Sequence, residues 1–277
     1  MRVYKALSIA GSDPSGGAGI QADLKAFSAL GVFGTTAVTA VVDENTVGVT
    51  GVHPVPIEFV SGQIHSVLSD VGADAIKIGM LHSSELIRAV KDAISEYRIS
   101  NIVLDPVMVA TSGDKLLQDE AIGTLKSELI PFVRLITPNI PEAEILSGQK
   151  IDGQADLPDL AKSLSEQFGG KVSVLLKAGH LEDDELVDVF YNAEEGAFLK
   201  LSQKRIQTKN THGTGCTLSS AVAAFLAKGF GLDEAITQAQ AYLHQAIVAG
   251  ADFPIGKGRG PVHHFWNVPG WGEGAKE

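Results

Sequence analysis

The sequence reads Thr208-Lys209-Asn210-Thr211-His212-Gly213-Thr214-Gly215-Cys216-Thr217 just before a helix that we expect to end at Lys228. Glycines and small hydroxyl residues at a helix N-terminus leave backbone N–H groups pointing outward, and the positive end of the helix dipole adds to their charge. This pattern predicts a site for an anion. The ordinary alternative is a loop with an N-capping threonine.

The only cysteine of the chain, Cys216, lies within this segment. A helix N-terminus lowers the pKa of a thiol, which suits a base or a nucleophile. A structural cysteine would more often lie in the middle of a helix, on its apolar face. The position of Cys216 therefore favours a catalytic site over an ordinary loop.

Short apolar segments alternate with segments whose apolar residues recur at helical spacing on both sides of this motif. Because the expected strands are apolar throughout, they are typical of a mainly parallel sheet covered on both faces. No linker or repeat divides the chain, so we predict one α/β domain over residues 1–266 and a loosely held tail over residues 267–277. We expect strands at residues 6–10, 35–42, 75–78, 102–104, 135–137 and 172–176, a hairpin over 186–201, and helices at 20–30, 56–68, 83–97, 119–129, 157–168, 217–228 and 232–249.

Composition excludes several classes of protein. With 277 residues, of which 44% are hydrophobic and 20% charged, the chain can bury a sizeable core. The net charge of −11 disfavours binding to nucleic acid or to an anionic membrane surface. No apolar run approaches the roughly 18 residues of a membrane helix, and one cysteine cannot form an intrachain disulfide, so we expect a cytoplasmic protein.

Polar residues follow several of the expected strands, at the edge where parallel sheets bind ligands. Asp105, Asn139 and Glu142 offer hard oxygen ligands that suit Mg²⁺. Asn139 and Glu142 also fit a helix N-cap with a capping box, and both roles are compatible. Lys177 follows an apolar strand and can reach a phosphate, or it is a solvated surface lysine.

The N-terminal glycine loop, residues 11–19, leads into a match to the G-x-G-x-x-A fingerprint of dinucleotide-binding proteins at residues 17–22. The match is poor, because the six residues from Gly11 to Gly16 separate the strand from the first fingerprint glycine, Gly17, which should follow its strand at once. The alternative is that Gly11 and Asp23 shape a pocket for a small polar molecule. The sequence contains no P-loop, no zinc-binding spacing and no G-x-S-x-G elbow, which argues against P-loop kinases, zinc enzymes and serine hydrolases of that type.

Together these motifs resemble the bacterial hydroxymethylpyrimidine/phosphomethylpyrimidine kinases, a family of the ribokinase superfamily that also contains pyridoxal kinases. The similarity covers almost the whole chain in collinear order and is most specific in the segment that holds Cys216. It is carried by residues 10–25, 77–81, 105–109, 137–142, 177–180, 209–217 and 256–264.

The resemblance implies a three-layer α/β/α fold with a mainly parallel sheet, and a homodimer. It implies ATP and Mg²⁺ as cosubstrates and an aminopyrimidine alcohol, or its phosphate, as the acceptor. Cys216 would be the base beside the Gly213, Thr214 and Gly215 backbone. The other roles it implies are a pyrimidine pocket of Gly11, Asp23, Glu44, Met80 and Val107, ATP binding by Asp105, Asn139, Lys177 and His212, and Mg²⁺ binding by Glu142 and Asp105.

Three positions depart from the pattern of that family. Glu44 stands where a glutamine is usual, Thr111 where a lysine is usual, and Ala178 where a glycine is usual. Glu44 bears on the identity of the acceptor, Thr111 on a loop over the phosphates, and Ala178 on packing. A pyridoxal-type kinase, a dinucleotide-binding oxidoreductase and a non-catalytic vitamin-binding protein remain as alternatives.

Overall fold

The computed structural model of the chain describes residues 2–108, 117–180 and 184–270. Within these residues, the main sheet has eight strands in the order β10-β9-β8-β7-β6-β5-β1-β2. In this order the strands β8, β7, β6, β5, β1 and β2 are parallel, whereas β9 is antiparallel to both of its neighbours, β8 and β10. The bounds are β1 Lys5–Ala10, β2 Phe33–Val38, β5 Ala75–Ile78, β6 Ile102–Leu104, β7 Leu135–Ile136, β8 Ser173–Leu176, β9 Glu185–Asn192 and β10 Ala197–Lys204.

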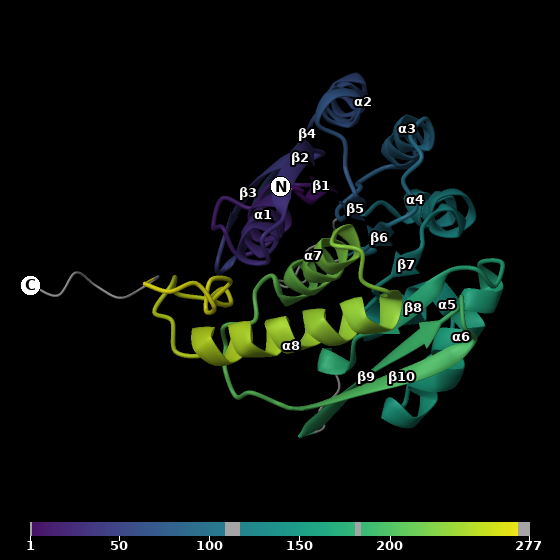
Figure 1. The fold of residues 1–277 in the computed structure, drawn as a ribbon. Coiled ribbons are helices and arrows are strands. Elements are labelled where there is room, and N and C mark those ends of the chain that lie inside the picture. Colours follow the sequence, from purple (N-terminus) through teal and green to yellow (C-terminus); the bar gives the residue numbers. More distant parts are fainter. Residues whose placement is uncertain (1, 109–116, 181–183, 271–277) are drawn as a thin grey trace, which may run out of the picture.

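Helices cover both faces of this sheet (Figure 1), so the predicted three-layer α/β/α fold is confirmed. Apolar side chains of α2 to α6 form one buried cluster with one face of the strands, and those of α1, α7 and α8 form a second cluster on the other face. The bounds are α1 Gly19–Ala29, α2 Ile57–Ser66, α3 Ser84–Ser95, α4 Asp119–Thr124, α5 Ile140–Ser147, α6 Leu157–Gln167, α7 Thr214–Ala227 and α8 Leu232–Gly250.

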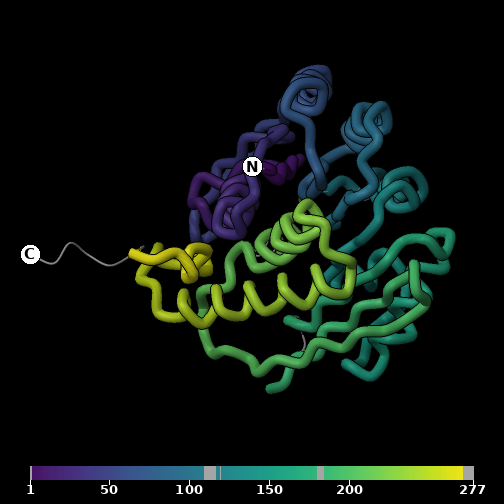
Figure 2. Tube along the Cα trace, in the orientation of Figure 1, coloured from purple at the N-terminus to yellow at the C-terminus, as the bar shows by residue number. Residues whose placement is uncertain are grey.

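Successive residues of a strand feed opposite clusters, which explains why the strands are apolar throughout. In β1, Ala6 belongs to the cluster with α1, α7 and α8, whereas Leu7 belongs to the cluster with α2 to α6 on the other face. Figure 2 follows the chain from this N-terminal strand, which is flanked by β5 and β2, to the segment beyond α8. Because the parallel strands run in the same direction, they all end at the same edge of the sheet.

The strand expected over residues 35–42 is wrong in its extent. It breaks at Thr39, whose hydroxyl donates to the carbonyl of Met80 at 2.9 Å. Beyond Thr39 the chain leaves the main sheet, and β3 (Ala40–Asn45) pairs with β4 (Gly48–Pro54) in a separate two-stranded sheet. No strand is predicted over residues 48–54, because two glycines, a proline and largely exposed side chains give no apolar pattern.

The C-terminal region contacts α8 up to Trp266, the last residue of the expected domain, and the described part of the expected tail, residues 267–270, is exposed. The indole N–H of Trp266 donates to the carbonyl of Tyr242 at 3.2 Å, and residues 265–270 form turns. Residues 271–277 of the expected tail lie outside the described residues. In the described part of the chain no helix has the length and hydropathy of a membrane span.

Candidate active site

A cavity of ≈ 1000 Å³ lies where the parallel strands end, and it brings together nearly all the predicted site residues. Its walls come from the glycine loop, the β3–β4 hairpin, the ends of β5 to β8, and the start of α7. The predicted residues that line it are Gly11, Glu44, Met80, Asp105, Val107, Asn139, Glu142, Lys177, His212, Gly213, Thr214, Gly215 and Cys216.

Gly213 to Cys216, which we call the nest, form the N-terminal end of α7. Gly213 is the N-cap of α7 with φ +77°, and a Cβ at this position would lie 1.7 Å from the carbonyl oxygen of Gly17. Only glycine fits this backbone conformation and this close approach. The first-turn N–H groups have no partner within the helix. That of Thr214 makes a long hydrogen bond to the carbonyl of Thr211, at 3.4 Å, and the others can face an anion in the cavity.

Cys216 is half-buried in the first turn of α7 and lines the cavity. Burial raises the pKa of its thiol to about 11, although the ammonium of Lys77 acts in the opposite direction. The carboxylates of Asp23 and Asp105 add to the increase. The prediction that the helix N-terminus lowers this pKa is therefore wrong, because burial and the carboxylates outweigh the helix dipole.

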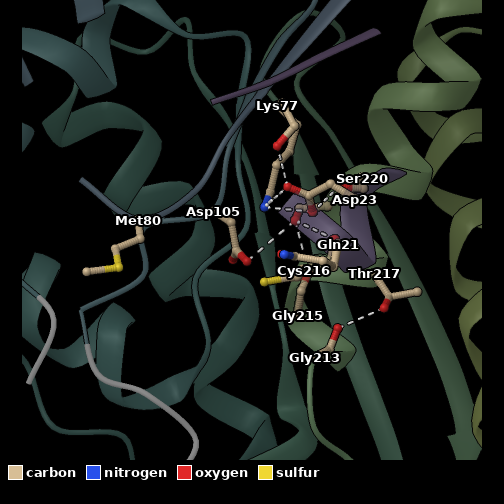
Figure 3. Close-up of polar contacts among 12 residues, drawn as sticks. Gln21, Asp23, Lys77, Met80, Asp105, Gly213, Gly215, Cys216, Thr217 and Ser220 are labelled. Atoms are coloured by element: carbon tan, nitrogen blue, oxygen red, sulfur yellow. Dashed lines mark hydrogen bonds and ion pairs between the residues drawn. The ribbon is translucent and has the colours of Figure 1, made fainter. Parts of the chain in front are cut away.

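A fully buried ion pair joins Lys77 to Asp23 close to Cys216 (Figure 3). The Nζ of Lys77 lies 2.9 Å from each carboxylate oxygen of Asp23, which also accept from Ser8 at 2.5 Å and Ser220 at 2.6 Å. Burial would lower the pKa of Lys77, but Asp23 raises it, so the ammonium stays charged.

These contacts correct the prediction for Asp23. Its carboxylate is fully buried, its oxygens are taken up by Lys77 and two serines, and it does not line the cavity, so it supports the site from below. Lys77 lies at the base of the cavity and was not predicted as a site residue. The sequence signal for it was a lysine inside the apolar strand Ala75-Ile76-Lys77-Ile78.

A second ion pair lies at the ends of β6 and β8. The Nζ of Lys177 is 2.8 Å from Oδ1 of Asp105, which also accepts from the Thr137 hydroxyl at 3.0 Å. Although burial would raise the pKa of Asp105, the ammonium groups of Lys177 and Lys77 hold it below its ordinary value. The alternative of a solvated Lys177 is set aside, because only 14% of its side chain is exposed.

Asn139 and Glu142 begin α5 with the predicted capping box. Each side chain accepts from the backbone N–H of the other residue at 2.9 Å. Burial raises the pKa of Glu142 to about 7. The Lys177 ammonium acts to lower this pKa, and the Asp105 carboxylate acts to raise it further. Two carboxylates thus face the cavity at one edge of the sheet, where a cation would relieve their repulsion.

Asp13 ties the glycine loop to the segment before the nest. Its carboxylate accepts from the N–H groups of Ser15, Gly17 and Ala18 at 2.7–2.9 Å, and it lies 2.8 Å from Nε2 of His212. Burial would lower the pKa of His212, but the hydrogen bond and charge of Asp13 raise it. The loop N–H groups that a pyrophosphate would need are used internally, which argues against the dinucleotide fingerprint.

Glu44 lies next to this pair at the β-bulge between Asp43 and Glu44. One ligand atom each from Asp13, Glu44 and His212 lie within 4.8 Å of one another. Among the described residues, this is the one cluster of three side chains with metal-ligand geometry. Asp13 is held in this cluster by its hydrogen bonds to the loop N–H groups and to His212. The cluster is distinct from the predicted Mg²⁺ pair of Asp105 and Glu142.

The model of the family described as phosphomethylpyrimidine kinase matches residues 13–263. The chain belongs to this family. It is 49% identical over 261 residues to the hydroxymethylpyrimidine/phosphomethylpyrimidine kinase of Rhizobium meliloti (strain 1021), covering 94% of this chain and 96% of the relative. It is 45% identical to the enzyme of the same name from Escherichia coli (strain K12), covering 96% of this chain and 98% of the relative.

Solved structures of similar fold come from both branches of the superfamily. Bacillus subtilis pyridoxal kinase in complex with ADP has a TM-score of 0.86 and 38% identity, covering 95% of this chain and 98% of that chain. Phosphomethylpyrimidine kinase from Clostridium difficile 630 has a TM-score of 0.77 and 38% identity, covering 89% and 100%. This family member is thus a kinase of the ribokinase-like fold and neither an oxidoreductase nor a mere binding protein.

Two of the three departures from the family pattern can be placed. Glu44 lines the cavity beside His212, whereas Ala178 is buried in the core cluster and its N–H donates to Asp188 at 2.6 Å. Ala178 therefore bears on packing, as predicted. Thr111 lies outside the described residues.

Proposed function

We propose that this chain transfers the γ-phosphoryl group of ATP to the hydroxymethyl group of 4-amino-5-hydroxymethyl-2-methylpyrimidine, and a second one to the resulting monophosphate. Family membership supports this activity. The observation that carries it is the nest, whose backbone donors open into a cavity that also holds Lys177 and Cys216. Phosphoryl transfer asks a protein mainly to position the reactants and to stabilise negative charge.

Both cosubstrates suit the residues at the site. Structures of Staphylococcus aureus pyridoxal kinase, 32–33% identical to this chain, were solved in complex with the ATP analogue AMP-PCP. Asp105 and Glu142 provide the hard oxygen atoms that Mg²⁺ prefers. Burial raises the pKa of Glu142 and the like charge of Asp105 adds to this, and a nearby cation would offset both effects. Bound there, Mg²⁺ would neutralise charge on the phosphates.

The chain's own residues then divide the work. The N–H groups of the nest hold the transferring phosphate, and the ammonium of Lys177 faces it from the end of β8. Cys216 takes the proton of the hydroxymethyl group, while Lys77 and Asp23 fix the floor beneath the thiol. Asp13 and His212 keep the glycine loop against the nest.

The pyrimidine end of the cavity contains the departure that matters for the acceptor. A glutamine amide both donates and accepts, as an aminopyrimidine requires, whereas an ionised Glu44 only accepts. It would leave a ring nitrogen facing a lone pair, which costs about 1–3 kcal/mol, or roughly 5- to 150-fold in affinity. Glu44 lies beside His212, and its charge adds to that of Asp13 in raising the pKa of His212 against the effect of burial.

Product analysis by mass spectrometry tests the acceptor directly, after incubation with MgATP and either the aminopyrimidine or pyridoxal. We expect the pyrimidine mono- and diphosphates. Glu44→Gln should lower the KM for the pyrimidine and flatten its pH dependence. Loss of all activity in Glu44→Gln, or phosphorylation of pyridoxal alone, would show that the carboxylate selects a different acceptor and would favour the pyridoxal-type kinase.

We further propose a homodimer in the cytoplasm. The β3–β4 hairpin exposes Val41 and, at its turn, Val47, which offer apolar contacts to a second copy of the chain. The chain has a single cysteine and hence no intrachain disulfide, in keeping with a reducing compartment. Light scattering coupled to size-exclusion chromatography should give twice the 29.1 kDa of one chain.

A further inference from the structure

A buried histidine from the segment after α8 lies directly behind the nest. The Nε2 of His264 is 3.0 Å from Oγ1 of Thr217, and this oxygen is 2.8 Å from the carbonyl oxygen of Gly213. His264 is 3% exposed, and Thr217 is fully buried. The contacts therefore run from the C-terminal segment to the residue at which the nest begins, and Figure 3 shows the last of them.

Donor and acceptor chemistry fixes the direction of both hydrogen bonds. A carbonyl oxygen only accepts, so the single hydroxyl hydrogen of Thr217 points to Gly213. The contact with His264 then requires an N–H on Nε2 that donates to the hydroxyl oxygen. Burial lowers the pKa of His264 to about 3, with Lys25 and His263 adding to the effect, so the ring is neutral and carries its one proton on Nε2.

The peptide held by these bonds is the one that opens the nest. The carbonyl of Gly213 accepts from both the N–H and the hydroxyl of Thr217, each at 2.8 Å. In a planar trans peptide the C=O and the N–H point in opposite directions. Fixing the Gly213 oxygen toward the helix therefore turns the N–H of Thr214 away from the helix, where it makes a long hydrogen bond of 3.4 Å to the carbonyl of Thr211, and sets the direction in which the nest begins.

His264 is itself anchored to α8. The hydroxyl of Tyr242 donates to the carbonyl of His264 at 2.6 Å, and the N–H of His263 donates to the carbonyl of Ala246 at 2.9 Å. A Cβ on Gly250 would lie 2.7 Å from the N–H nitrogen of His263, so the segment packs closely against the end of the helix. The ring has little freedom to move away from Thr217.

We propose that His264 is a positioning residue for phosphoryl transfer: through the hydroxyl of Thr217 it holds the Gly213 peptide, and with it the N–H groups of the nest, in the orientation that the transferring phosphate requires. Neither His264 nor Thr217 is among the residues that line the cavity, so both act through the backbone. The proposal rests on the function proposed above.

The first test compares turnover numbers. Thr217→Val keeps the shape of the side chain and removes the hydroxyl, so kcat should fall about 10- to 100-fold while the KM for the pyrimidine stays within about two-fold. Thr217→Ser should restore most of kcat. Thr237→Val is the matched control, because the exposed Thr237 of α8 makes the same bond to a carbonyl four residues earlier, at 2.8 Å, and does not line the cavity.

The second test varies the donor. His264→Gln keeps an N–H that can reach Thr217, and should retain more of kcat than His264→Phe, which keeps a ring without a donor. Melting temperatures measured alongside separate a loss of folding from a loss of turnover. A Thr217→Val enzyme that melts like the parent and turns over within two-fold of it would overturn the proposal.

The third test needs neither an acceptor nor a variant. In ¹⁵N-labelled protein, two-bond ¹H–¹⁵N spectra distinguish a proton on Nε2 from one on Nδ1. We expect the Nε2–H form for His264, unchanged across the physiological pH range. The Nδ1–H form, or protonation near the ordinary histidine pKa, would contradict the hydrogen-bond direction even if the proposed acceptor were wrong. Failure of the proposed function alone would show instead as a parent enzyme that does not phosphorylate the pyrimidine.

Discussion

Replacing Cys216 by alanine should slow phosphoryl transfer while leaving substrate binding nearly intact. Burial raises the pKa of the thiol to about 11, so at pH 7.5 about one molecule in 3,000 carries the thiolate, at a cost of about 5 kcal/mol. The thiolate is rare but strongly basic. If it accepts the hydroxymethyl proton, kcat should rise about ten-fold per pH unit between pH 7 and 9.

The assay is a coupled measurement of ADP release at saturating MgATP and pyrimidine, for the parent and for Cys216→Ala. General-base catalysis contributes about 10²- to 10⁴-fold, so kcat of Cys216→Ala should fall by that factor and lose its pH dependence. The KM values should change by less than about three-fold, because the donors of the nest are backbone groups that the substitution leaves in place.

Alkylation by iodoacetamide checks the pKa independently. Since the chain has one cysteine, total labelling reports Cys216 alone, and Cys216→Ala provides the blank. The rate should increase with pH up to about 10, because only the thiolate reacts. Undiminished turnover in Cys216→Ala would refute the role as base, and a labelling midpoint below pH 8 would refute the effect of burial.

Three other substitutions probe the surroundings of Cys216. The pKa of Glu142 is raised to about 7, so protons compete with Mg²⁺ below that pH, and the Mg²⁺ concentration for half-maximal rate should fall as pH rises from 6 to 8. Glu142→Gln should weaken Mg²⁺ binding and abolish this dependence on pH. Superimposable Mg²⁺ titrations of parent and variant would make Glu142 only a helix cap. Gly213→Ala should lower kcat at least 100-fold or prevent folding, whereas Gly231→Ala, at the N-cap of α8 with φ −68° and open space, should not. Asp13→Asn should lower the free energy of unfolding by about 3 kcal/mol at pH 7, measured by urea denaturation. Because the pKa of Asp13 is lowered in the folded state, the difference in stability between parent and variant should shrink as pH falls below 3.8, the pKa of Asp13 in the unfolded chain. An equal loss of stability at all pH values would contradict this.

The sequence was most informative where one element carries the whole signal. Apolar strands, helical spacing and the 208–217 motif are patterns among neighbouring residues, so they are visible in the sequence. The structure has the sheet, the helices and the nest that these patterns predict. The capping box of Asn139 and Glu142 is equally local. The β3–β4 hairpin was missed because β4 contains two glycines and a proline and is mostly exposed, so no core imposes a pattern on it. The apolar start of β3 was assigned to the preceding strand.

Contacts between distant residues could not be predicted in this way. Lys77 and Asp23 are 54 positions apart, and Thr217 and His264 are 47 apart, so only the fold reveals that they meet. The sign of the Cys216 pKa shift was wrong for the same reason. A helix N-terminus is visible in the sequence, whereas the depth of burial and the carboxylates of Asp23 and Asp105 are products of the tertiary structure.

The distribution of charge explains how an acidic protein can present a site for a polyanion. The chain carries a net charge of −11, yet basic side chains gather around the cavity, namely Lys77, Lys177, Lys204, Arg205, Lys209 and Arg259. An isolated buried cation is costly, and the carboxylates of Asp23 and Asp105 offset that cost while the cavity is empty. Asp23 lies below the cavity and keeps Lys77 in place, whereas Asp105 lines it and can share Lys177 with a phosphate.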